Sequence, residues 1–112
     1  MDEILDRAAL ANLLATVGND REFLREMIDT YLGDAPKLIA AMRDAINARN
    51  ADDLRRAAHS LKSNSANFGA TALTRLCKSL EDLAKTGTIE GAADLLAPIE
   101  TEYAQVTRAL RQ

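Results

Sequence analysis

Apolar residues recur every three or four positions along almost the whole chain. The last segment shows the pattern most clearly, with Leu95, Leu96, Ile99, Tyr103, Val106 and Leu110. This spacing places apolar side chains on one face of an α-helix. Strands would instead require alternating runs and hairpin turns such as Asn-Gly, and neither occurs. The pattern therefore predicts an all-α fold.

Glycine, asparagine, aspartate and proline divide the pattern into segments. Gly33 and Asp34, with Pro36 in the next turn, predict that one helix ends and another begins there. Pro98 predicts a kink or break near Asp94 in the last helix. The expected helical segments cover about residues 5–17, 20–32, 34–46, 50–67, 71–85 and 88–110.

Length and composition limit the architecture and the class of function. The chain has 112 residues, of which 47% are hydrophobic, which suits one globular domain over residues 1–112. Short connections favour antiparallel neighbours, so we predict an antiparallel four-helix bundle with an additional short N-terminal helix. The net charge of −3 gives no argument for nucleic acid or an anionic membrane. No signal peptide or membrane span is visible.

His59 is the only histidine, and helical spacing turns it away from the expected core. Counting about 100° per residue from Leu54, His59 falls near 140°, almost opposite the apolar stripe. Ser63 and Ala66, one and two turns further on, are small. The helix surface therefore presents an imidazole that a large partner could reach. A lone surface histidine without a special role has the same pattern, and this alternative stays open.

Two further residues bear on possible chemistry. Lys62 places a cation one turn from His59. Cys77 falls on an apolar stripe, so a buried side chain is expected there in preference to a reactive thiol. One cysteine and one histidine cannot form a zinc site by themselves, so no metal site is expected.

The run from Ala58 to Ala70 resembles the signature of histidine phosphotransfer (HPt) domains. The family has glycine directly after the lysine, and this chain has Ser63, which leaves partner preference and rate open. The positions that match the signature are His59, Leu61, Lys62, Ser65 and Gly69, followed by the pattern Leu73, Leu76, Leu80 and Glu81.

The resemblance implies a phosphoryl carrier in a multi-step phosphorelay. His59 would accept the group from the phosphoaspartate of a response-regulator receiver domain and pass it to another receiver. Magnesium is expected on the receiver, and no cofactor on this chain. The resemblance further implies a cytoplasmic location, either as a separate protein or as part of a hybrid sensor histidine kinase. No nucleic acid and no direct membrane contact are expected.

Roles for other residues follow from the same resemblance. Lys62 would stabilise phosphoryl charge. Glu81 would orient the imidazole, although an ordinary solvated carboxylate fits the sequence equally well. Leu61, Ser65 and Gly69 belong to the structural part of the motif. Residues expected to contact the partner are Arg55, Arg56, Ser63, Ala66, Lys78 and Lys85.

Two other functions remain open from the sequence. The bundle could dock a receiver or an enzyme without transferring phosphate. Alternatively, His59 could act as the general base of a small enzyme, which would require a pocket and a second catalytic group.

Overall fold

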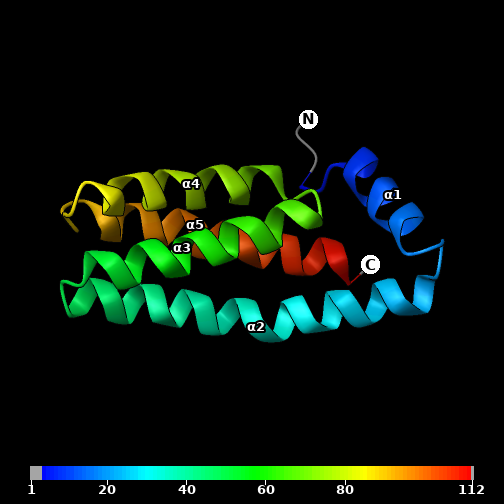
Figure 1. Cartoon of the computed structure of the whole chain (residues 1–112), viewed down its shortest axis with the longest axis horizontal. Coiled ribbons are helices and arrows are strands. Elements are labelled where there is room, and N and C mark those ends of the chain that lie inside the picture. Colours follow the sequence, from blue (N-terminus) through cyan, green and yellow to red (C-terminus); the bar gives the residue numbers. More distant parts are fainter. Residues whose placement is uncertain (1–3, 112) are drawn as a thin grey trace.

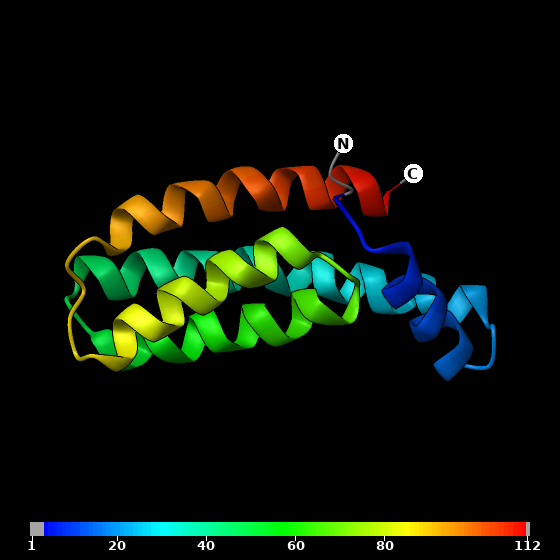
Figure 2. The same cartoon turned by 90° about the horizontal axis from the view of Figure 1, so that it is seen from above.

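The computed structural model describes residues 4–111, which form five α-helices and no strand (Figures 1 and 2). The predicted all-α bundle with a short N-terminal helix is confirmed. The long helices α2 to α5 lie antiparallel to their chain neighbours, and α1 lies against one end of the bundle. Their bounds are α1 Arg7–Thr16, α2 Arg21–Asn47, α3 Ala51–Asn67, α4 Thr71–Lys85 and α5 Ala92–Leu110.

The predicted break at Gly33 and Asp34 is wrong, because α2 continues through both residues and through Pro36. One uninterrupted stripe of α2 faces the core and holds Tyr31, Ala35, Ile39, Met42 and Ala45. Its burial against the other helices outweighs the local stop signals.

Pro36 has no N–H to donate to the carbonyl of Leu32 four residues before it. The hydroxyl of Tyr103, on α5, approaches that carbonyl at 3.5 Å and donates a long hydrogen bond to it. A side chain from a neighbouring helix thus partly replaces the missing backbone donor.

The last helix also differs from its predicted course. It begins at Ala92, after Gly91 at φ 82°, and not at Thr88. Of the kink or break predicted near Asp94, the break is wrong, because α5 continues through Pro98 to Leu110, and the kink stays a prediction. Pro98 lies on the exposed side, while Leu96 and Ile99 beside it are buried. The helix therefore retains its buried face across the proline.

The turn between α3 and α4 also holds α1 in place. Gly69 has a φ of 72°. Its N–H donates to the carbonyl of Ala66, and the N–H of Ala70 donates to the carbonyl of Ser65, so these two hydrogen bonds end α3. The carbonyl of Gly69 accepts a 2.7 Å hydrogen bond from the N–H of Asp6. A Cβ at Gly69 would lie 2.7 Å from the carbonyl oxygen of Asp6, so this close approach requires glycine.

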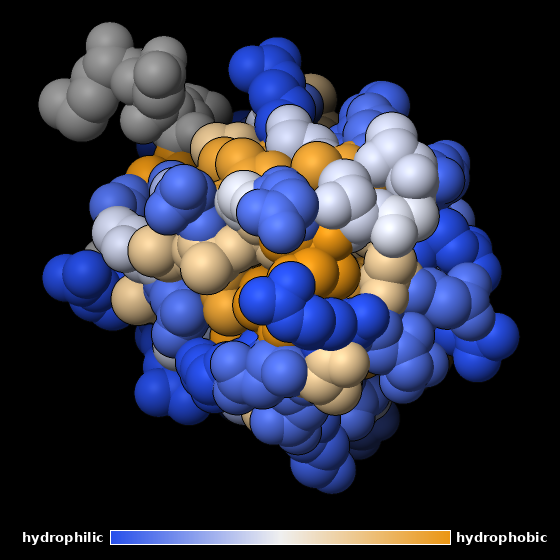
Figure 3. Space-filling model, turned by 90° about the vertical axis from the view of Figure 1, so that its left-hand side faces the viewer, coloured by the Kyte–Doolittle hydropathy of each residue, from blue (hydrophilic) through white to orange (hydrophobic). Residues whose placement is uncertain are grey.

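The surface is mainly polar. Figure 3 shows the end of the bundle opposite α1, where hydrophilic side chains surround a smaller area of apolar ones. None of the helices within residues 4–111 is long and apolar enough to cross a membrane.

Candidate functional site

The direction of His59 follows from how α3 begins and packs. Asn50 caps the helix by accepting a 3.0 Å hydrogen bond from the N–H of Asp53. Leu54 and Leu61 on the inner face are fully buried. His59 therefore lies on the outer flank, where its side chain is 56% exposed. The helical spacing of the sequence predicts this orientation.

A buried carboxylate from α4 reaches the imidazole. The Nδ1 atom of His59 lies 2.8 Å from Oε2 of Glu81. The side chain of Glu81 is only 3% exposed, so the solvated-carboxylate interpretation is wrong. The Nζ of Lys62 donates to Oε1 of Glu81 at 2.6 Å, and the Nζ of Lys85 lies 3.8 Å from Oε2. The carboxylate thus joins one imidazole and two ammonium groups.

The electrostatics of this cluster determine which imidazole nitrogen is available. Burial raises the pKa of Glu81. The hydrogen bonds from Lys62 and His59 and the charges of Lys62 and Lys85 together outweigh burial, so the pKa lies below its ordinary value of 4.5. Glu81 is therefore ionised near neutral pH and can only accept hydrogen bonds. In the neutral form of the imidazole, Nδ1 therefore carries the proton and the lone pair lies on Nε2.

Three of the predicted partner-binding cations form ion pairs with carboxylates other than Glu81. Arg55 and Arg56 contact Asp52 at 3.0 Å and 2.8 Å, and Lys78 contacts Asp82 at 2.8 Å. These pairs are exposed and partly neutralise the charge that a partner would meet. The structure therefore brings Lys62, Glu81 and Lys85 to His59, but not the other cations.

The two small residues near His59 remain accessible. Ser63 and Ala66 are both exposed on α3, beyond His59 in the direction of the α3–α4 turn. No bulky side chain projects from these two positions, so they leave room on this face.

The structural residues of the motif lie beneath this surface. Leu61 and Ser65 are fully buried, and the hydroxyl of Ser65 shares a 2.8 Å hydrogen bond with that of Tyr31. Burial raises the pKa of Tyr31 to about 12, against the lowering effect of the bond with Ser65. The ring of Tyr31 also packs on Phe68, with centroids 5.0 Å apart. This polar link between α2 and α3 has no signal in the sequence, because it joins residues 34 positions apart.

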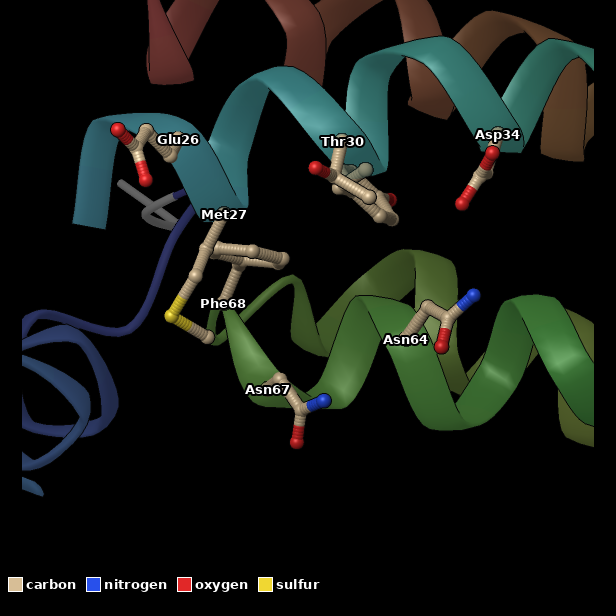
Figure 4. Close-up of a pocket in the computed structure, with 8 residues that line it drawn as sticks. Glu26, Met27, Thr30, Asp34, Asn64, Asn67 and Phe68 are labelled. Carbon is tan, nitrogen blue, oxygen red and sulfur yellow. The ribbon is translucent and has the colours of Figure 1, made fainter. Parts of the chain in front are cut away.

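A pocket of about 260 Å³ lies between α2 and α3 (Figure 4). Glu26, Thr30 and Asp34 line it from α2, and Asn64 and Asn67 from α3. His59, Lys62 and Glu81 do not belong to its lining. The imidazole therefore faces solvent beside its carboxylate and does not line this pocket, which weakens the interpretation of His59 as the general base of an enzyme.

Comparison with known proteins decides the family. The family model described as "Hpt domain" matches residues 26–109. The chain belongs to the Hpt domain family. This Hpt domain is similar to the phosphorelay protein LuxU of Vibrio vulnificus, with 26% identity over 99 residues that cover 88% of this chain and 84% of LuxU.

Solved structures agree with this assignment. Histidine-containing phosphotransfer protein B (HptB) of Pseudomonas aeruginosa PAO1 superposes with a TM-score of 0.91 at 31% identity, covering 100% of this chain and 95% of that one. The HPT domain of a sensor hybrid histidine kinase from Shewanella has the same fold, with a TM-score of 0.76 at 19% identity and coverage of 97% and 92%.

Membership in the family confirms two predictions from the sequence. The fold class is that of an Hpt domain, and the function is histidine phosphotransfer in a phosphorelay. Receiver domains are the class of partner with which Hpt domains of phosphorelays interact.

Proposed function

We propose that His59 is the phosphoryl acceptor and donor of this Hpt domain, and that Nε2 is the reacting atom. The observation that carries the proposal is the 2.8 Å contact between Nδ1 of His59 and the ionised, buried Glu81. This contact occupies Nδ1 and leaves Nε2 as the second ring nitrogen of a side chain that is 56% exposed. A nucleophile that must enter another protein's active site requires this accessibility.

In the accepting step, Nε2 attacks the phosphorus of a receiver phosphoaspartate. The Nε2–P bond forms as the bond from phosphorus to the aspartyl oxygen breaks, and the aspartate leaves as a carboxylate. The transition state spreads negative charge over three oxygens. Lys62 donates a hydrogen bond to Glu81 and Lys85 forms a longer ion pair with it. An ammonium has three donors, so each lysine has donors left for a phosphoryl oxygen.

The partner is a receiver domain, which we propose holds the magnesium ion that the transfer uses. It approaches the face of α3 that carries His59, Ser63 and Ala66. The exposure and small size of Ser63 and Ala66 support this choice of face.

The test is transfer of a radioactive phosphoryl group from a panel of phosphorylated receivers. The label should appear on the wild-type chain, be lost in acid and survive alkali, as a phosphoramidate would. His59→Gln should retain the helical circular dichroism and take up no label. Label on that variant would refute the assignment, whereas receiver binding without any label on the wild type would favour a docking module.

Lys62 gives a second test with a matched control. Lys62→Ala should slow transfer by about ten-fold or more, which corresponds to roughly 1.4 kcal/mol of barrier. It should also destabilise the fold by about 1–3 kcal/mol, because Oε1 of the buried Glu81 loses its donor. Lys62→Arg retains the charge and should recover much of both losses. Equal rates for wild type and Lys62→Ala would limit Lys62 to a structural role.

A further inference from the structure

The same contact has a consequence for the phosphorylated state, provided that His59 is the acceptor as proposed. We propose that Glu81 holds a proton on Nδ1 of phosphorylated His59, so that this domain gives up its phosphoryl group from the protonated imidazole. Glu81 is then a positioning residue for the donor half of the reaction. Glu81 then determines the highest pH at which the domain still transfers its phosphoryl group rapidly.

The chemistry of the leaving group explains why this proton matters. When the receiver aspartate attacks phosphorus, an O–P bond forms, the Nε2–P bond breaks, and its electron pair stays on Nε2. If Nδ1 carries a proton, the ring leaves as neutral imidazole. If Nδ1 is bare, the ring must leave as an imidazolate anion, which is a far poorer leaving group. Transfer should therefore proceed mainly from molecules in which Nδ1 is protonated.

The geometry makes Glu81 the group that holds this proton. Its Oε2 lies 2.8 Å from Nδ1, and the carboxylate is 3% exposed, so water screens the attraction poorly. A protonated phosphoimidazole is positively charged on the ring, and an ionised carboxylate at this distance stabilises it.

Other charges around the site act in the opposite direction or from further away. From α4, Lys85 shares Oε2 of Glu81 at 3.8 Å, and from α3, Lys62 occupies Oε1 at 2.6 Å. Arg55 and Arg56, one turn before His59, are paired with Asp52. No charged group of α2 within residues 4–111 forms an ion pair with the imidazole, so Glu81 is the anion that directly faces Nδ1.

Replacing Glu81 with glutamine changes this charge with almost no change of shape. Lys62 can donate only to the amide oxygen of the new side chain, because its other atom is an NH2 group. That NH2 group then faces Nδ1 and donates to it. Glu81→Gln should therefore favour the bare Nδ1, which is the opposite of what the carboxylate favours.

The experiment phosphorylates the wild type and Glu81→Gln with phosphoramidate, a small donor that requires no receiver. Transfer to one purified receiver is then followed between about pH 6 and pH 9, where histidine chemistry responds to pH. We expect Glu81→Gln to transfer roughly ten-fold more slowly at about pH 8 and to approach the wild-type rate at about pH 6. Asp82→Asn is the matched control, because it removes an adjacent carboxylate that pairs with Lys78 and not with the imidazole. It should retain the wild-type profile.

Nitrogen NMR of the phosphorylated wild type makes the test independent of any variant. The chain has one histidine, so its ring signals need no assignment by mutation. A proton on Nδ1 at about pH 8 is expected, and a bare Nδ1 there would overturn the proposal. Identical pH profiles for wild type and Glu81→Gln would also overturn it while leaving His59 as the acceptor. Absence of phosphate on His59 would instead refute the proposed function.

Discussion

Gly69→Ala should destabilise this domain more than alanine at two other glycines. Gly69 ends the His59 helix at a φ of 72°, and its carbonyl accepts the N–H of Asp6 at 2.7 Å. An added Cβ would lie 2.7 Å from the backbone oxygen of Asp6 and 3.0 Å from the Cβ of Ala9. Because the nearest atom belongs to the backbone, the segment before α1 must move.

The cost can be estimated from two parts. Holding a non-glycine residue in the left-handed region costs roughly 1–2 kcal/mol. Losing the hydrogen bond from Asp6 adds about 0.5–1.5 kcal/mol, so the total is about 1.5–3.5 kcal/mol. Gly18 has a φ of 70° with nothing within 4 Å of a Cβ, so alanine there carries only the first part. Gly33 lies within α2 with open space around it, and alanine there should stabilise by about 0.5–1 kcal/mol.

Urea unfolding of the three variants, followed by circular dichroism, measures these differences. The expected order of stability is Gly33→Ala, wild type, Gly18→Ala and then Gly69→Ala. If Gly69→Ala and Gly18→Ala lose equal stability, the contact with Asp6 contributes nothing, and the reasoning from the close approach is refuted.

Three more predictions concern the site and the core. Ser63→Gly should retain phosphoryl transfer, whereas Ser63→Arg should greatly slow transfer with a similar melting temperature, because its bulk blocks the receiver. If both variants transfer phosphoryl groups at the same rate, receivers do not cover this face. Cys77 is fully buried, and burial, followed by the charge of Glu81, raises the pKa of its thiol to about 12. Iodoacetamide should therefore alkylate it at least about a hundred-fold more slowly in the native chain than in the urea-unfolded chain, which mass spectrometry can measure. Because the pKa of Glu81 is lowered in the folded state, its carboxylate stabilises the fold at pH values above its ordinary pKa of 4.5, and this stabilisation is lost as the pH falls through the lowered pKa. The free energy of unfolding of Glu81→Gln should therefore depend less steeply on pH across this range than that of the wild type.

The sequence predicted the helices best where local signals and packing agree. The segment predicted at residues 50–67 matches α3, and the helical spacing counted from Leu54 predicted the direction of His59. At Gly33 and Pro36 local signals and packing disagree. Gly33 and Pro36 are local signals for the end of a helix, whereas burial along one face of α2 favours a continuous helix. The sequence does not show which effect is larger, because the depth of burial depends on neighbours distant in sequence.

Glu81 shows a different limit of sequence analysis. Its position one turn after Cys77 and beside Leu80 places it on the buried face of α4, which was a readable signal. A carboxylate on an apolar face is unexpected without a partner, and its partners come from another helix as well as its own. The contacts with His59 and Lys62 require the register between α3 and α4, and one sequence does not provide that register.

The position of His59 on an open helix flank limits how the domain can work with several receivers. A stable protein interface covers about 800 Å² on each partner, and the whole bundle measures only 43 × 28 × 20 Å. Two receivers cannot both reach the same Nε2, so the donor must depart before the acceptor arrives. The domain then acts as a shuttle with alternating occupancy, and slow departure of either partner would limit the flux. For an association rate of about 10⁶ M⁻¹s⁻¹, a departure rate of about 1–10 s⁻¹ corresponds to a Kd of roughly 1–10 μM. Tighter binding would slow the relay, so moderate affinity is what this exposed histidine requires.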